Sequence, residues 1–95
     1  MSKKLSQEWR ISEEAIANTV GDEVVILHLG NRTYFGLDSI GVEFWNGIKS
    51  NQRPDQIAAS IARRHEIEPE QVNKDILEFM NELIANGLIV PAGSE

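Results

Sequence analysis

The side chains that most often carry out catalysis are scarce and poorly grouped in this sequence of 95 residues. His28 lies in an apolar segment and His65 at the expected end of a helix, and neither belongs to a metal-binding pattern such as HExxH. Structural or surface roles are expected for both histidines. Ser39 is followed by Gly41 but lacks the flanking glycine of a nucleophile elbow, so it is better suited to capping a helix.

Metal and cofactor sites have no better support. The absence of cysteine excludes a disulfide framework, a Cys-ligated zinc site and a cysteine nucleophile. The 15 carboxylates fall mostly at helix starts and on exposed helix faces, where solvation and ion pairing explain them. The glycines form neither a GxGxxG motif nor a Walker loop. The sequence therefore predicts a protein that is not an enzyme and that uses no metal or cofactor.

An unpaired strand edge is the stronger candidate for a binding site. Residues 23–29 (EVVILHL) and 32–37 (RTYFGL) are typical of β-strands, and the intervening Gly30 and Asn31 favour a tight two-residue hairpin turn. The second strand has only one certain partner, so its other edge could accept an extended peptide as an added strand. The alternative is that the first strand or the C-terminal tail covers this edge.

The remaining elements complete an α+β, winged-helix-like fold in which a three-stranded antiparallel sheet packs on three helices. The first strand is expected at 15–20 and the helices at about 39–50, 54–65 and 69–86. Asp38 or Ser39 is expected to cap the first helix, directly after the hairpin. Residues 1–8 are expected to fray, and the ordered core of a single domain 1–95 is expected to span about 13–90.

The last helix has an unusually wide apolar face. At 100° per residue this face spans roughly 160°, whereas a helix covering a core on one side needs only about 100°. The excess surface either packs against a second neighbour or lines one wall of a groove. The residues of this face are Val72, Ile76, Leu77, Phe79, Met80, Leu83 and Ile84.

Nucleic-acid and membrane partners are disfavoured. A winged-helix fold would place the last helix against DNA, but residues 68–86 carry five acidic side chains against Lys74 alone. The net charge of −6 would also repel a phosphate backbone. No apolar run is long enough for a signal peptide or a membrane span. A cytoplasmic location is expected.

Three segments, in their order and spacing, resemble the PqqD-like superfamily: TYFGLDSIGVEFWNGI, PDQIAASIARRHEI and VNKDILEFMNELIANGLI. The resemblance covers about residues 13–90. Members of this superfamily are recognition elements for the precursors of ribosomally made, modified peptides. The resemblance implies a three-stranded sheet on three helices without catalytic residues.

The resemblance also implies a binding site for the leader region of a precursor peptide. The family binds the leader as a further antiparallel strand beside the third strand, in a cleft walled by the third helix. Some apolar residues at the matching helix positions must belong to the core, and Asp75 could equally be a surface residue. The matching positions are Arg32, Thr33, Tyr34, Phe35 and Gly36 on the strand, and Asp75, Ile76, Phe79, Met80 and Leu83 on the helix, to which the wide apolar face adds Leu77 and Ile84.

Several partner schemes are compatible with this resemblance. The YFGLD…W pattern is most similar to stand-alone recognition proteins of lasso-peptide pathways, which deliver the leader to a leader peptidase or another maturation enzyme. A PqqD-type chaperone would instead present its precursor to a radical-SAM enzyme. The remaining alternatives are a peptide-binding module of unrelated purpose and a structural module that self-associates through the open edge.

Overall fold

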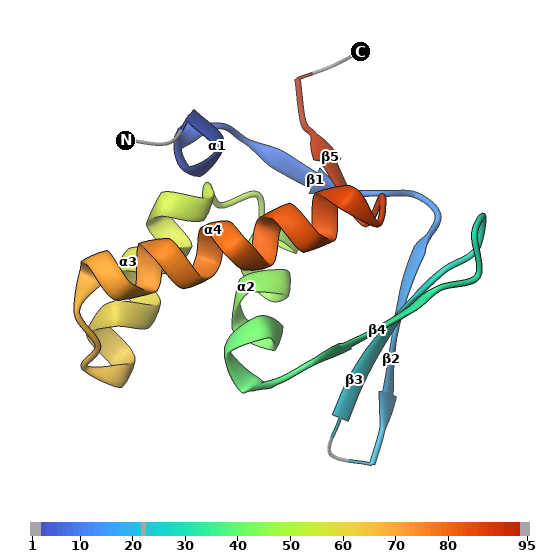
Figure 1. Cartoon of the computed structure of the whole chain (residues 1–95), viewed down its shortest axis with the longest axis horizontal. Helices are drawn as coiled ribbons and strands as arrows, with labels where there is room; N and C mark the ends of the chain where they lie inside the picture. The colour runs from blue at the N-terminus through green and yellow to red at the C-terminus, as the bar shows by residue number, and fades with distance from the viewer. Residues whose placement is uncertain (1–2, 22, 94–95) are drawn as a thin grey trace.

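The computed structural model of the chain describes residues 3–21 and 23–93, whose helices pack on one side of a projecting sheet (Figure 1). The elements, in chain order, are α1 (Lys3–Ser6), β1 (Trp9–Ile11), β2 (Ala15–Val20), β3 (Glu23–His28), β4 (Tyr34–Leu37), α2 (Ser39–Lys49), α3 (Pro54–His65), α4 (Pro69–Ala85) and β5 (Ile89–Pro91).

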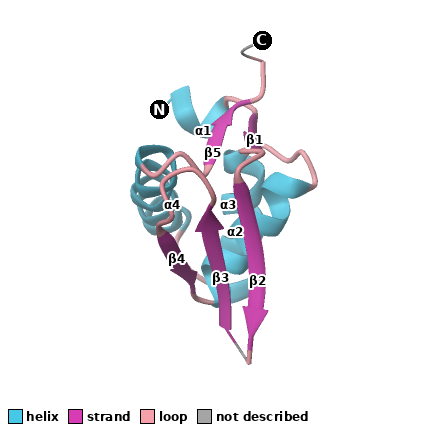
Figure 2. Cartoon of the chain, turned by 90° about the vertical axis from the view of Figure 1, so that its right-hand side faces the viewer, coloured by secondary structure: helices cyan, strands magenta, loops and turns pink. Residues whose placement is uncertain are grey.

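The central sheet has the antiparallel order β2-β3-β4, which confirms the predicted three-stranded antiparallel sheet. Figure 2 shows its three strands side by side with the helices behind them. Ile26 on β3 is completely buried and pairs with Phe35 on β4. Because side chains alternate between the two faces of a strand, Phe35 and Leu37 share the face that is turned toward the core. The predicted α+β fold is confirmed.

The turn between β3 and β4 differs from the predicted two-residue turn at Gly30 and Asn31. The N–H of His28 donates to the carbonyl of Thr33, so the loop enclosed by this pair spans residues 29–32, and its left-handed residue is Arg32, with φ 61°. The ring Nδ1 of His28 accepts hydrogen bonds from the backbone N–H of Gly30 (3.0 Å) and of Asn31 (3.2 Å). These bonds stabilise a wider loop that needs only one left-handed residue, at its end.

The connection from β4 to α2 is as short as predicted. Leu37 ends the strand, and Asp38 is the N-cap of α2, with its Oδ1 accepting a hydrogen bond of 2.7 Å from the N–H of Gly41. This cap satisfies a donor that the first turn of the helix would otherwise leave without a partner. The first turn of α2 therefore lies directly beside the end of β4.

The three long helices each bury apolar side chains that recur at helical spacing. Buried side chains on α2 and α3 are Phe44, Trp45, Ile48, Ile57, Ala58, Ile61 and Ala62. On α4 the buried stripe consists of Val72, Ile76, Met80 and Leu83. Part of the wide apolar face of α4 therefore belongs to the core. The helix ends before Gly87, whose φ of 71° suits a glycine.

A second, two-stranded sheet pairs β1 with β5 and ties the two ends of the chain together. The prediction that residues 1–8 fray is wrong for residues 3–8, while residues 1–2 lie outside the described part. Leu5 and Trp9 are each only 5% exposed, and the indole Nε1 of Trp9 donates to the backbone carbonyl of Lys4 at 2.9 Å. Short segments show no periodicity, and only tertiary packing orders them.

No helix within residues 3–21 and 23–93 combines the length and the apolar character that crossing a bilayer requires.

Replacing Trp9 with Ala tests the packing of the N-terminal segment. Loss of a buried indole is expected to reduce the free energy of unfolding by about 3 kcal/mol or more. Arg10→Ala is the matched control, because Arg10 is exposed on the same strand and should change stability by less than about 0.5 kcal/mol. Urea unfolding followed by circular dichroism measures both. Equal stability of the two variants would contradict the packing of Trp9 into the core.

Candidate functional site

The outer edge of β4 is open in the described part of the chain. β4 pairs with β3 alone, and neither β2 nor β5 covers its other side. The N–H of His28 donates to the carbonyl of Thr33 at 3.0 Å, so this pair is bonded across the hairpin. Since bonded positions alternate along an antiparallel ladder, Phe35 and Leu37 direct their main-chain groups toward β3.

The main-chain groups of Tyr34 and Gly36 consequently face away from β3. Each offers one N–H donor and one C=O acceptor at the open edge. Gly36 does not have a positive φ, and a Cβ added to it would have no heavy atom within 4 Å. Neither backbone conformation nor packing within the free protein therefore requires glycine at this position.

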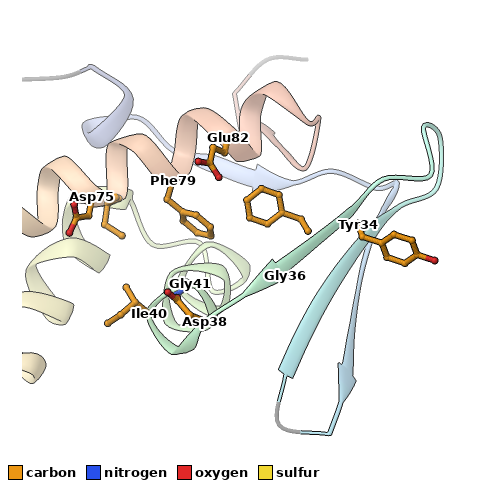
Figure 3. A pocket seen from close by; sticks show the side chains of 10 residues that line it. Tyr34, Gly36, Asp38, Ile40, Gly41, Asp75, Phe79 and Glu82 are labelled. Carbon is orange, nitrogen blue, oxygen red and sulfur yellow. The ribbon is translucent and has the colours of Figure 1, made fainter.

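A groove of about 640 Å³ runs beside this edge, between β4, the first turn of α2 and one face of α4 (Figure 3). Apolar side chains form its floor and carboxylates stand along its walls. It is lined by Tyr34, Phe35, Gly36, Asp38, Ile40, Gly41, Asp75, Ile76, Phe79 and Glu82.

Contacts among three aromatic rings connect the elements that form the groove. The ring of Phe79 on α4 lies 5.8 Å from that of Phe35 on β4 and 5.7 Å from that of Phe44 on α2, measured between centroids. The second pair is nearly perpendicular, a favourable edge-to-face arrangement. A Cβ at Gly41 would lie only 3.3 Å from Cζ of Phe79, so glycine at this position leaves room for the ring.

The carboxylates of the groove have few partners. Asp38 caps α2, and Oδ1 of Asp75 accepts a hydrogen bond of 2.9 Å from the side-chain amide of Gln71. Within the described residues, no hydrogen bond or ion pair involves the carboxylate of Glu82. No lysine, arginine or histidine is among the lining residues. The groove is therefore apolar at its base and acidic at its walls.

Six of the twelve residues that the sequence singled out line this groove: Tyr34, Phe35, Gly36, Asp75, Ile76 and Phe79. Arg32 and Thr33 lie just before β4 and outside the groove lining. Met80 and Leu83 are completely buried in the core, and Leu77 and Ile84 are half-buried on α4 outside the lining.

Sequence reasoning missed Asp38, Ile40, Gly41 and Glu82 as groove residues. Asp38 and Ile40 could have been found, because a helix that starts immediately after an edge strand must place its first turn beside that edge. Glu82 could have been found from helix geometry, since positions 75, 79 and 82 follow the i, i+4, i+7 spacing of one helix face. The buried positions on α4 could not be separated from the groove positions by hydrophobicity alone.

The two histidines have the structural and surface roles predicted for them. His28 organises the hairpin loop, and Nε2 of His65 contacts the carboxylate of Glu43 at 2.5 Å, beside the ion pair of Arg64 with Glu43 at 2.9 Å. Neither histidine lines the groove. Within residues 3–21 and 23–93, no cluster of three His, Asp or Glu side chains could hold a metal ion.

Comparisons with known proteins agree with this architecture. The family model described as "Coenzyme PQQ synthesis protein D (PqqD)" matches residues 23–89. Domains of this family are non-catalytic peptide-binding modules, so the chain is not an enzyme. The search of curated proteins found no match.

Two solved structures are similar to the chain. "TbiB1 in Complex with the TbiA(beta) Leader Peptide" has 31% sequence identity and a TM-score of 0.78, covering 90% of this chain and 98% of that one. "Lasso peptide synthetase B1 complexed with the leader peptide" has 19% identity and a TM-score of 0.80, covering 87% and 98%, and shows similarity of fold alone. The family match over more than half of the chain, together with the 31% identity to TbiB1, shows that this chain belongs to the PqqD family.

Proposed function

We propose that the chain recognises the leader segment of a ribosomally made precursor peptide by binding it as an added β-strand along β4. The observation that carries this proposal is the open edge at Tyr34 and Gly36, which lies directly beside an apolar groove. Main-chain hydrogen bonds at such an edge supply affinity, and the groove supplies side-chain specificity. A related protein of the same fold, TbiB1, is described in complex with a leader peptide.

The energetics of the site suit moderate, reversible binding. The two N–H and two C=O groups at the edge could form four hydrogen bonds, each contributing about 0.5–1.5 kcal/mol net. Covering the half-buried rings of Phe35 and Phe79 adds roughly 25 cal/mol for each Å² of apolar surface removed from water. The ordering of a flexible leader opposes both contributions.

As part of this proposal, the loaded chain delivers the leader to a separate leader peptidase or another maturation enzyme in lasso-peptide biosynthesis. The YFGLD…W pattern and the fold shared with a lasso peptide synthetase B1 support this scheme. The domain would act as one recognition unit. It would work in the cytoplasm, because a chain without cysteine has no disulfide that would require an oxidising compartment.

A second candidate is a PqqD-type chaperone that presents a precursor to a radical-SAM enzyme. The family description, which names coenzyme PQQ synthesis, favours it. The two schemes use the same edge and groove and differ in the enzyme that must contact the loaded chain. Both predict the same effect of substitutions at β4 and α4.

Tyr34→Pro tests the use of the strand edge. Proline removes the N–H that faces outward and leaves the bonds to β3 intact, so the sheet should persist. Binding of the leader of any short precursor that is encoded beside this gene should weaken by about 10-fold or more, because one acceptor on the peptide loses its partner. Isothermal titration calorimetry measures the effect, and circular dichroism verifies the fold.

Tyr34→Ala is the matched control for this substitution. The phenol is 77% exposed and points away from the groove (Figure 3), so its removal should change the affinity by less than about 3-fold. Equal losses for the proline and alanine variants would exclude a main-chain role for this residue.

Phe79→Ala tests the groove on α4. Loss of the ring should weaken leader binding by about 10-fold or more, because a buried aromatic contact contributes most where water is excluded. Leu77→Ala is the control, since Leu77 is half-buried on the same helix but outside the groove. Titration calorimetry at a temperature where both variants are folded should show little effect of the control. A comparable loss for Leu77→Ala would place the binding surface on a different face of α4.

A further inference from the structure

The charges of the groove indicate which leaders it can accept. On α4, Phe79 lies between Asp75 and Glu82 in sequence, and the side chains of all three line the groove (Figure 3). Asp38 adds a third carboxylate on the opposite wall, at the start of α2. No cationic side chain from the described residues lines the same space. A ligand that fills the groove must therefore approach carboxylates that the protein itself does not neutralise.

We propose that the leader segment held in this groove carries an apolar residue, and that Lys or Arg stands two positions before it, two positions after it, or at both places. The apolar side chain packs on Phe79 and Phe35, and the basic side chain reaches Glu82 or Asp75. This inference rests on the proposed function, because it assumes a peptide paired with β4. It assigns a specificity role to two carboxylates on α4.

The spacing follows from strand geometry. A peptide residue opposite Phe35 has its side chain on the face of Phe35, that is, in the groove, whereas its immediate neighbours point to the other face. The next groove-facing residues therefore lie two positions away, at a distance of about 6.6 Å along the strand. On α4, Phe79 is separated from Asp75 and Glu82 by axial rises of about 6 Å and 4.5 Å. The flexible stem of lysine or arginine can accommodate the difference.

The two carboxylates on α4 affect mainly which leaders bind, and to a smaller extent how tightly a given leader binds. Asp75 and Glu82 are exposed, so a single ion pair with the ligand should change the affinity by only about 2- to 5-fold. An acidic leader would meet repulsion at the same positions, and this repulsion widens the discrimination between leaders. The overall charge of −6 adds long-range attraction for basic peptides, which salt should weaken.

Selection from a phage-displayed library of random 16-residue peptides tests this inference, even where the natural leader is not identified. The library is panned in parallel against the wild-type chain and against Tyr34→Pro. Peptides that are enriched only on the wild type should share an apolar residue with Lys or Arg two positions away. The most enriched peptide is then synthesised, together with a version in which glutamine replaces the basic residue.

The double variant Asp75→Asn/Glu82→Gln should bind the synthetic basic peptide about 2- to 5-fold more weakly than the wild type does. It should bind the glutamine version with unchanged affinity, so the two changes are not additive. Raising NaCl from about 0.05 to 0.5 M should weaken binding of the basic peptide to the wild type, and should weaken its binding to the double variant less, because that variant keeps only the long-range attraction of its remaining net negative charge.

The control is Glu70→Gln/Glu78→Gln, which removes two carboxylates from α4 outside the groove. If this control loses as much affinity for the basic peptide, the effect comes from net charge alone, and the local role of Asp75 and Glu82 is wrong. Recovery of Tyr34-dependent peptides without basic residues would overturn the inference but leave the proposed function intact. If no recovered peptide depends on Tyr34, the proposed function fails as well.

Discussion

The contacts of Phe79 with Phe35 and Phe44 connect the three elements around the groove. Each ring comes from a different element, so together they hold β4, α2 and α4 at a fixed separation. Gly41 has little room for a side chain beside this cluster, which keeps the first turn of α2 close to the rings. The groove therefore lies where the hydrophobic core reaches the protein surface, and its apolar base is continuous with that core.

The open edge of β4 is the second constraint. An unpaired strand edge usually invites aggregation, and proteins tend to protect it with charge, with a covering element or by keeping it short. β4 is short, and the carboxylates of Asp38, Asp75 and Glu82 stand beside its edge. These charges disfavour pairing between two copies of this acidic chain while leaving the edge accessible to a basic or neutral peptide. The features that protect the edge and those that select the ligand therefore coincide.

Much of this arrangement could be predicted from the sequence, and the exceptions have physical reasons. Strand β2, the buried faces of α2 and α3, the cap at Asp38 and the stop at Gly87 follow local rules of periodicity and capping. The β1–β5 sheet could not be predicted in this way, because its short strands become ordered only through tertiary packing. The loop at 29–32 depends on hydrogen bonds to the His28 ring, which no turn motif encodes. On α4, hydrophobicity could not separate the completely buried Met80 from the groove residue Phe79.

Amide hydrogen exchange measured by NMR, with and without the leader of any short precursor that is encoded beside this gene, tests strand addition most directly. In the free protein, the amides of Tyr34 and Gly36 should exchange quickly, whereas that of Phe35 should be protected by its bond to β3. Saturation with the leader should protect Tyr34 and Gly36 and leave the amides of α3 unchanged. If the leader binds while both edge amides continue to exchange quickly, the leader does not pair with β4, and strand addition is not how this protein recognises it.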